Sequence, residues 1–124
     1  MIRPHRGRLP RVHPTAFIDD SAQVIGDEVT IGHGALVHGC TIENRCLIGM
    51  GVILLNGSQV GTESIVAAGT LLVENMQVPP RSLVMGSPGK VKRTLTDDEV
   101  AGIQGYANRY VGYRVDYMDV RDHS

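Results

Sequence analysis

A strict six-residue periodicity runs through the chain and limits its possible folds more than any other feature. Between residues 42 and 84 every sixth residue is aliphatic: Ile42, Ile48, Leu54, Val60, Val66, Leu72, Val78 and Val84. Upstream of residue 42 the six-residue spacing is interrupted once and then continues through Ile25, Ile31 and Val37. A second interruption separates these residues from Val12 and Ile18, which are again six residues apart. A helix repeats every ~3.6 residues and a plain strand every two, so neither explains a period of six. The sequence therefore predicts a repeat architecture.

A second set of positions, four places after each aliphatic residue, is mostly small or β-branched. It includes Cys46, Val52, Ser58, Ser64 and Thr70, and upstream Val29, Ala35 and Thr41. We interpret each hexapeptide as one short strand and one corner, with three hexapeptides to a coil. The aliphatic residue fills a narrow interior, which the small residue shares. The chain is thus predicted to be all-β, a parallel β-helix in which residues 12–88 form about four coils that stabilise one another by stacking.

Composition and charge exclude several classes of partner. The chain has 15 glycines, no tryptophan and one phenylalanine, as expected for a narrow, regular core. Its net charge of −1 argues against nucleic-acid binding, which favours a strongly basic face. Neither a membrane-spanning apolar run nor a secretory leader is evident. Two cysteines make no disulfide framework, so we expect a cytoplasmic protein.

The C-terminal part is predicted to be helical. Prolines at 79, 80 and 88 end the solenoid, and residues 90–95 are expected to link it to a helix. Thr96 and Glu99 have the spacing of a capping box, which places the helix from Asp97 to about Met118. One stripe of that helix contains Ile103, Tyr106, Tyr110, Tyr113 and Tyr117. We expect a single domain, with a β-helix over residues 1–95 and a helix over 96–124 that packs on it or on a neighbouring subunit.

Three segments resemble the γ-class carbonic anhydrase family: residues 12–18 (VHPTAFI), 31–40 (IGHGALVHGC) and 79–91 (PPRSLVMGSPGKV). The second is the most specific, since hexapeptide acyltransferases share an ending like the third. The resemblance implies a left-handed β-helix that forms homotrimers, with zinc at each interface held by three histidines from two subunits. His33 and His38 match two of these histidines, which in the family come from opposite sides of the subunit interface. Zinc-bound hydroxide would then attack carbon dioxide to give bicarbonate.

The chain also departs from this family. Relatives carry an Arg-Gly-Asp segment, an Asn-x-Gln-Asp segment and the first zinc histidine, none of which is present here. Residues 24–27 (VIGD) run straight into the 31–40 segment, as if a block of coils had been excised. Solenoids tolerate such a loss because their contacts are between neighbours. We therefore expect a carbonic anhydrase-like protein whose activity is weak or lost.

Asp19 is our candidate for the missing third ligand. It follows the inward Ile18 as His38 follows the inward Val37, so the two should stack in adjacent coils. Two histidines and a carboxylate suit zinc, and also iron or another divalent metal. His13 is a rival, because it should stack near Gly32 and thus close to His33. Alternatively, Asp19 is an ordinary turn residue, and His33 and His38 form hydrogen bonds across an interface without metal.

Two other functions remain open. An acyl-CoA-dependent acyltransferase would use one histidine as general base, although the chain has no long loop insertion of the kind those enzymes use. A structural trimer would use the solenoid only for assembly. Cys46 is expected to be a small core residue, and Cys40 to be structural.

Overall fold

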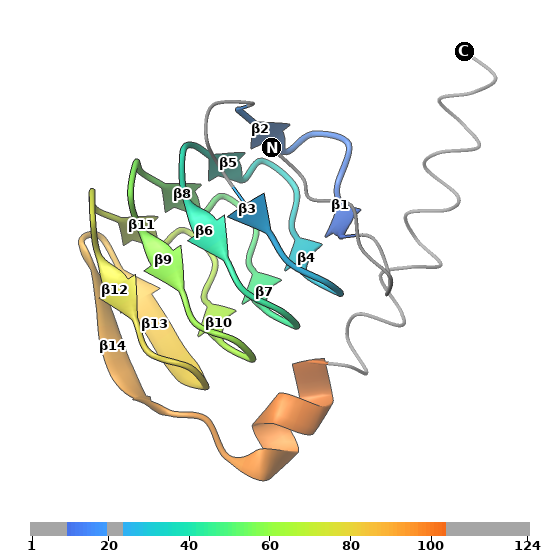
Figure 1. Cartoon of the computed structure of the whole chain (residues 1–124), viewed down its shortest axis with the longest axis vertical. Coiled ribbons are helices and arrows are strands. Elements are labelled where there is room, and N and C mark those ends of the chain that lie inside the picture. Colours follow the sequence, from blue (N-terminus) through green and yellow to red (C-terminus); the bar gives the residue numbers. More distant parts are fainter. Residues whose placement is uncertain (1–9, 20–23, 104–124) are drawn as a thin grey trace, which may run out of the picture.

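The computed structural model describes residues 10–19 and 24–103, and these form a parallel β-helix with three faces (Figure 1). One face contains β1 (Arg11–Val12), β4 (Thr30–Ile31), β7 (Leu47–Ile48), β10 (Ile65–Val66), β13 (Ser82–Gly86) and β14 (Gly89–Thr94). The second contains β2 (Phe17–Ile18), β5 (Leu36–Val37), β8 (Ile53–Leu54) and β11 (Leu71–Leu72). The third contains β3 (Val24–Ile25), β6 (Thr41–Ile42), β9 (Gln59–Val60) and β12 (Gln77–Val78). The predicted hexapeptide solenoid is therefore confirmed.

The register between coils changes along the solenoid. Phe17 in the first coil pairs with Leu36, nineteen residues later, and Leu36 pairs with Ile53, only seventeen residues later. From there the spacing is eighteen, as in the pairing of Ile53 with Leu71. The short interval arises because the unit between Val37 and Ile42 has five residues. This shift decides which side chains become neighbours at the corners.

The core is a column of aliphatic side chains, one from each of the strands β1 to β13. Most of them are fully buried: Ile25, Ile31, Val37, Ile42, Ile48, Leu54, Val60, Val66, Leu72 and Val84. The small residues predicted to share the interior are also buried, including Ala35, Cys46 and Ser64. The expectation for Thr41 was wrong: Thr41 is half-buried, and Cys40, 1% exposed, takes the inward place. The five-residue unit moves that position one residue towards the N-terminus.

The C-terminal coil ends in a hairpin rather than in the expected linker. Strand β14 pairs antiparallel with β13, and Gly86 and Gly89 face each other at the turn. Gly86 has a φ of 106°, which suits a residue without a Cβ. Residues 89–94 are rich in Lys and Arg, and this made the second strand of the hairpin resemble an exposed linker in the sequence.

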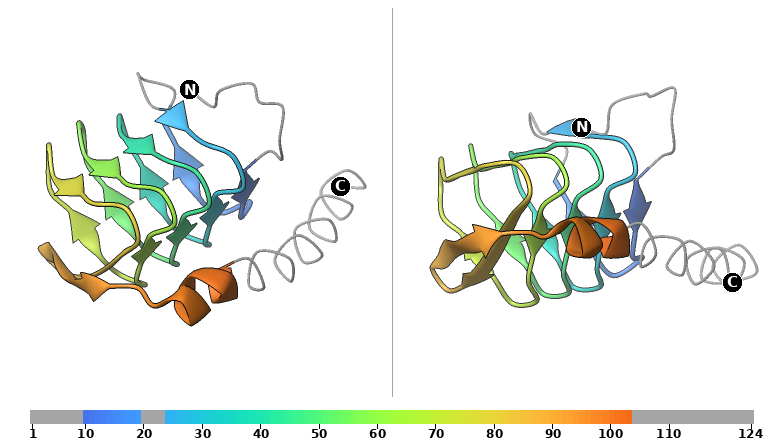
Figure 2. Two further views of the ribbon diagram at one scale, coloured as in Figure 1. Left: turned by 60° about the horizontal axis from the view of Figure 1, so that its bottom comes forward. Right: turned by 90° about the horizontal axis from the view of Figure 1, so that it is seen from below.

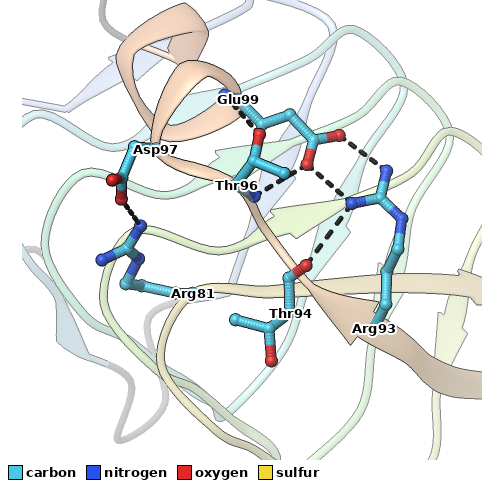
Figure 3. A network of polar contacts seen from close by, with 6 residues as sticks. All are labelled: Arg81, Arg93, Thr94, Thr96, Asp97 and Glu99. Carbon is cyan, nitrogen blue, oxygen red and sulfur yellow. Dashed lines mark hydrogen bonds and ion pairs between the residues drawn. The ribbon is translucent and has the colours of Figure 1, made fainter.

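A network of polar contacts fixes the start of the helix, which begins at residue 97 (Figure 3). The N–H of Thr96 donates to Glu99 Oε1 at 2.8 Å, and the N–H of Glu99 donates to Thr96 Oγ1 at 3.2 Å. The capping box is thus confirmed. Arg93 donates to both carboxylate oxygens of Glu99 at 2.6 Å, and Arg81 pairs with Asp97. The helix is described to residue 103, so the four tyrosines of the predicted stripe lie outside the described residues.

The described part of the helix lies along one edge of the solenoid (Figure 2). Val100 and Ile103 lie beside Arg45 and Glu63, at the corner that follows β6 and β9. Ile103 is 4% exposed. The helix therefore borders the corner between the β3 and β4 faces, while the β2–β5–β8–β11 face lies away from it. In the described part of the chain, no helix is long and apolar enough to cross a membrane.

Candidate metal centre

The two histidines of the 31–40 segment lie at opposite ends of one strand. His33 belongs to the corner that precedes β5, and His38 directly follows β5. His33 is exposed and His38 is partly exposed. The strand between them contributes Val37 to the core and Leu36 to the outer surface. One chain therefore presents a histidine at each edge of the same face.

His38 lies between Asp19 and Asn56, which come from the coils on either side. Its Nε2 is 2.8 Å from Asp19 Oδ2, and its Nδ1 is 2.5 Å from Asn56 Oδ1. The stacking follows from the backbone, because the N–H of Asp19 donates to Val37 O and the N–H of His38 donates to Leu54 O. The side chains of His38 and Asp19 are 39% and 29% exposed. The predicted stacking of Asp19 beside His38 is present.

His33 lies against His13, the rival candidate. The ring centroids of the two histidines are 5.3 Å apart, at an interplanar angle of 58°. The N–H of Thr15 donates to His13 Nδ1 at 3.1 Å, and the N–H of Gly34 donates to Thr15 Oγ1 at 3.0 Å. Burial, with a smaller contribution from His33, lowers the pKa of His13. His13 is thus a buried, neutral ring that supports the corner carrying His33.

The pair of Asp19 and His38 fits a divalent metal. Two ligands that each lie 2.0–2.2 Å from a tetrahedral zinc are ~3.3–3.6 Å apart. The observed separation of 2.8 Å between Nε2 and Oδ2 would have to increase by about 0.5–0.8 Å, and both side chains are partly exposed and have space to rotate. Among the described residues no three His, Cys, Asp or Glu side chains of one chain come together as a metal-binding group. A single copy thus supplies Asp19 and His38 together, with His33 at the far end of β5.

Neither cysteine has the environment of a nucleophile. Burial raises the pKa of the Cys40 thiol to about 11 and that of Cys46 to about 12. Both thiols are therefore protonated at neutral pH, and only the thiolate is reactive. This agrees with the expected structural roles.

Asn56 was missed by the sequence reasoning. It lies eighteen residues after His38, but the coil spacing at this point is seventeen, so the residue level with His38 is Leu55. Asn56 is level with Gly39, and its side chain reaches back to the His38 ring. The five-residue unit was the signal that could have located it.

Comparison with known proteins places the chain among hexapeptide-repeat proteins. The family described as the hexapeptide repeat of succinyl-transferase matches residues 24–56 and 41–73. Protein YrdA of Escherichia coli is 44% identical over 101 residues, which are 82% of this chain and 55% of YrdA. A probable carbonic anhydrase of Methanocaldococcus jannaschii is 53% identical over 88 residues, 71% of this chain and 55% of the archaeal protein. The chain belongs to the γ-carbonic-anhydrase-like hexapeptide-repeat proteins.

This γ-carbonic-anhydrase-like chain matches only part of the length of each of these relatives. Gamma carbonic anhydrase 1 of Arabidopsis thaliana mitochondria is 44% identical over 81% of the chain but only 34% of the plant protein. The chain thus spans about half or less of the length of these relatives. Solved structures show the same fold in acyltransferases. A serine acetyltransferase from Brucella abortus strain S19 matches with a TM-score of 0.57 and 28% identity, over 70% of this chain and 41% of the enzyme.

Proposed function

We propose that this protein is a carbonic anhydrase-like metalloprotein that holds zinc between neighbouring copies of a homotrimer. His33 of one copy and His38 and Asp19 of the next are the ligands. The observation that carries the proposal is the 2.8 Å approach of Asp19 Oδ2 to His38 Nε2 on a partly exposed surface. The similarity to carbonic anhydrases supports the choice of these residues.

The surface beside this pair is suited to association. The outward residues of the β2–β5–β8–β11 face are Phe17, Leu36, Ile53 and Leu71, which we call the aliphatic face. Phe17 is 59% exposed and Ile53 is 37% exposed. The β3–β6–β9–β12 face instead presents Val24, Thr41, Gln59 and Gln77, of which three are polar. An apolar strip of this kind is typical of an interface.

The positions of the histidines suit a closed ring. In a ring each contact joins two different edges of neighbouring copies. His33 lies at one edge of the aliphatic face and His38 at the other. A head-to-tail contact can therefore bring His33 of one copy to the Asp19–His38 pair of the next.

The chemistry of this donor set agrees with hydration of carbon dioxide. Two imidazoles and a carboxylate leave one position open, and zinc in such a set lowers the pKa of a bound water to about 7. Asp19 replaces a neutral histidine with an anion, and the Arg, Asp and Gln that relatives place near the metal are absent. Loss of such supporting groups commonly costs 10–100-fold each. We therefore propose a weak or lost activity towards carbon dioxide and bicarbonate, with iron as a second possible metal.

The acyltransferase alternative has one supporting observation, the likeness to serine acetyltransferases. A general base needs a ring nitrogen available to the acceptor. Both nitrogens of His38 already face oxygen atoms of the same chain, and this favours the metal proposal. A trimer without catalysis shares the aliphatic face and differs only in binding no metal.

The experiment is a metal analysis of purified protein and of three variants. We expect zinc close to one per chain in the unmodified protein. Asp19→Ala should lower zinc occupancy as much as His38→Ala and His33→Ala do. The control is Glu74→Ala, which removes an exposed carboxylate two coils further along the same edge of the solenoid as His38. Retention of zinc by Asp19→Ala, with loss in His38→Ala, would show that water or His13 completes the shell. Bound acyl-CoA without zinc would favour the alternative.

A further inference from the structure

We propose that Asn56 is a positioning residue that sets the orientation and proton of His38, an inference that rests on the proposed metal site. The amide oxygen of Asn56 lies 2.5 Å from His38 Nδ1. An amide oxygen can only accept, so Nδ1 must carry the proton. The other ring nitrogen, Nε2, faces the Asp19 carboxylate, which also only accepts, so a metal that binds Nε2 displaces the proton of this contact.

The backbone around Asn56 holds its side chain in this place. The N–H of Gly57 donates to Gly39 O at 2.9 Å, and the N–H of Asn75 donates to Asn56 O at 3.0 Å. Gly39 directly follows His38 and has a φ of 58°. A Cβ at Gly39 would meet Asn56 Oδ1. The glycine therefore leaves the space that the amide occupies, and the acceptor is fixed relative to the imidazole.

At another corner an asparagine side chain also lies against a glycine of the neighbouring coil, but its amide oxygen has a different hydrogen-bond partner. A Cβ at Gly26 would likewise meet Asn44 Oδ1. There the amide oxygen accepts from the backbone N–H of Asp27 at 2.8 Å. Asn44 therefore only joins two coils, whereas the same arrangement at Asn56 is directed at a side chain. Replacing Asn44 is therefore a matched control, because it removes a contact between coils without removing a contact to His38.

The orientation matters because histidine can bind a metal through either nitrogen. Metal-bound histidines usually donate their other N–H to an oxygen acceptor, which fixes the ring and increases its basicity. Asp19 and Asn56 lie on opposite sides of the ring, one at each nitrogen. Asn56 thus directs Nε2 to the metal and keeps the ring from turning over.

The test compares Asn56→Ala, Asn56→Asp and Asn44→Ala in the full chain. Zinc affinity is measured by competition with a chromophoric chelator, and the His38 ring nitrogens are observed by ¹⁵N NMR with and without zinc. We expect Asn56→Ala to lower zinc affinity by about 10–100-fold and to remove the protonated Nδ1 signal. Asn56→Asp, which keeps an acceptor oxygen, should restore both. Asn44→Ala should lower stability and leave the zinc affinity and the His38 Nδ1 signal unchanged.

Three results would overturn the inference. These are an unchanged zinc affinity and spectrum in Asn56→Ala, an equal loss in Asn44→Ala, or zinc bound through Nδ1 of His38. If the unmodified chain binds no zinc, the proposed function fails separately. The metal-free spectra then decide the inference, because Asn56→Ala must still change the His38 nitrogen shifts.

Discussion

At the scale of single residues, the environment of His38 depends on a glycine as much as on its polar neighbours. Gly39 combines a φ of 58° with a close approach to the Asn56 amide. Gly69 has a similar φ of 73°, but a Cβ there would meet nothing within 4 Å. The two glycines therefore separate the effect of backbone conformation from the effect of crowding.

We predict that Gly39→Ala destabilises the protein more than Gly69→Ala does. A left-handed backbone costs a residue with a Cβ roughly 1–2 kcal/mol, which both variants incur. In Gly39→Ala alone the Asn56 amide must also move aside and lose its hydrogen bond to His38, which adds about 0.5–1.5 kcal/mol. Urea unfolding at one protein concentration measures the difference. Equal losses in the two variants would contradict the described packing around His38.

The sequence predicted one neighbour of the His38 ring, Asp19, but not the other, Asn56. The period of the aliphatic residues placed Ile18 level with Val37, and hence Asp19 beside His38. The same reasoning did not reach Asn56, because its contact depends on a coil shortened by one residue. It depends also on a side chain that leans back over Gly39, which periodicity does not describe.

At the scale of elements, the capping box was predictable because it is local, whereas the hairpin of β13 and β14 was not. Thr96 and Glu99 interact within one helical turn. The hairpin joins residues whose charged side chains resemble a linker. Its Arg93 then pairs with Glu99, so the hairpin also supports the helix start.

We predict that the helix start loosens in acid. Hydrogen bonding from Arg93, with further donation from the Thr96 backbone, lowers the pKa of Glu99 from 4.5 to about 2. A lowered carboxyl pKa stabilises the folded state above the unfolded pKa, and this is lost as the pH falls from about 4.5 towards 2. The protection factor of the Glu99 amide, which is its exchange rate corrected for the intrinsic pH dependence of exchange, should fall over that range. Glu99→Gln should remove the pH dependence of this protection factor, and a protection factor that still falls with pH in the variant would contradict this assignment.

At the scale of the whole molecule, the three outer faces of the solenoid differ in polarity. The aliphatic face is apolar, the β3–β6–β9–β12 face is mostly polar, and the β1–β4–β7–β10–β13 face presents the half-buried Leu47, Ile65 and Leu83. A narrow core with few aromatic residues gives a coil stack limited stability of its own, so association adds buried area. We predict a particle of about 40 kDa, three times the 13.4 kDa of one chain. Light scattering at micromolar concentration measures it, and a mass of one chain would contradict the trimer.

The aliphatic face should be the surface that holds the trimer together. Ile53→Lys places a charge on this face, where burial of an unpaired charge is costly. We expect this variant to dissociate to single chains. Gln59→Lys makes the same change on the polar β3–β6–β9–β12 face and should leave the mass unchanged. Dissociation by Gln59→Lys but not by Ile53→Lys would assign the contact to the other face.

The central claim is that two copies share each metal, and complementation tests it most directly. His33→Ala and His38→Ala, each purified alone, should hold almost no zinc. When the two variants are co-expressed, every mixed ring has one contact where an intact His33 meets an intact His38. Random mixing then gives about a quarter of the zinc of the unmodified trimer, because three-quarters of the rings carry one of three sites. Mixed trimers as free of zinc as the single variants would contradict the shared site.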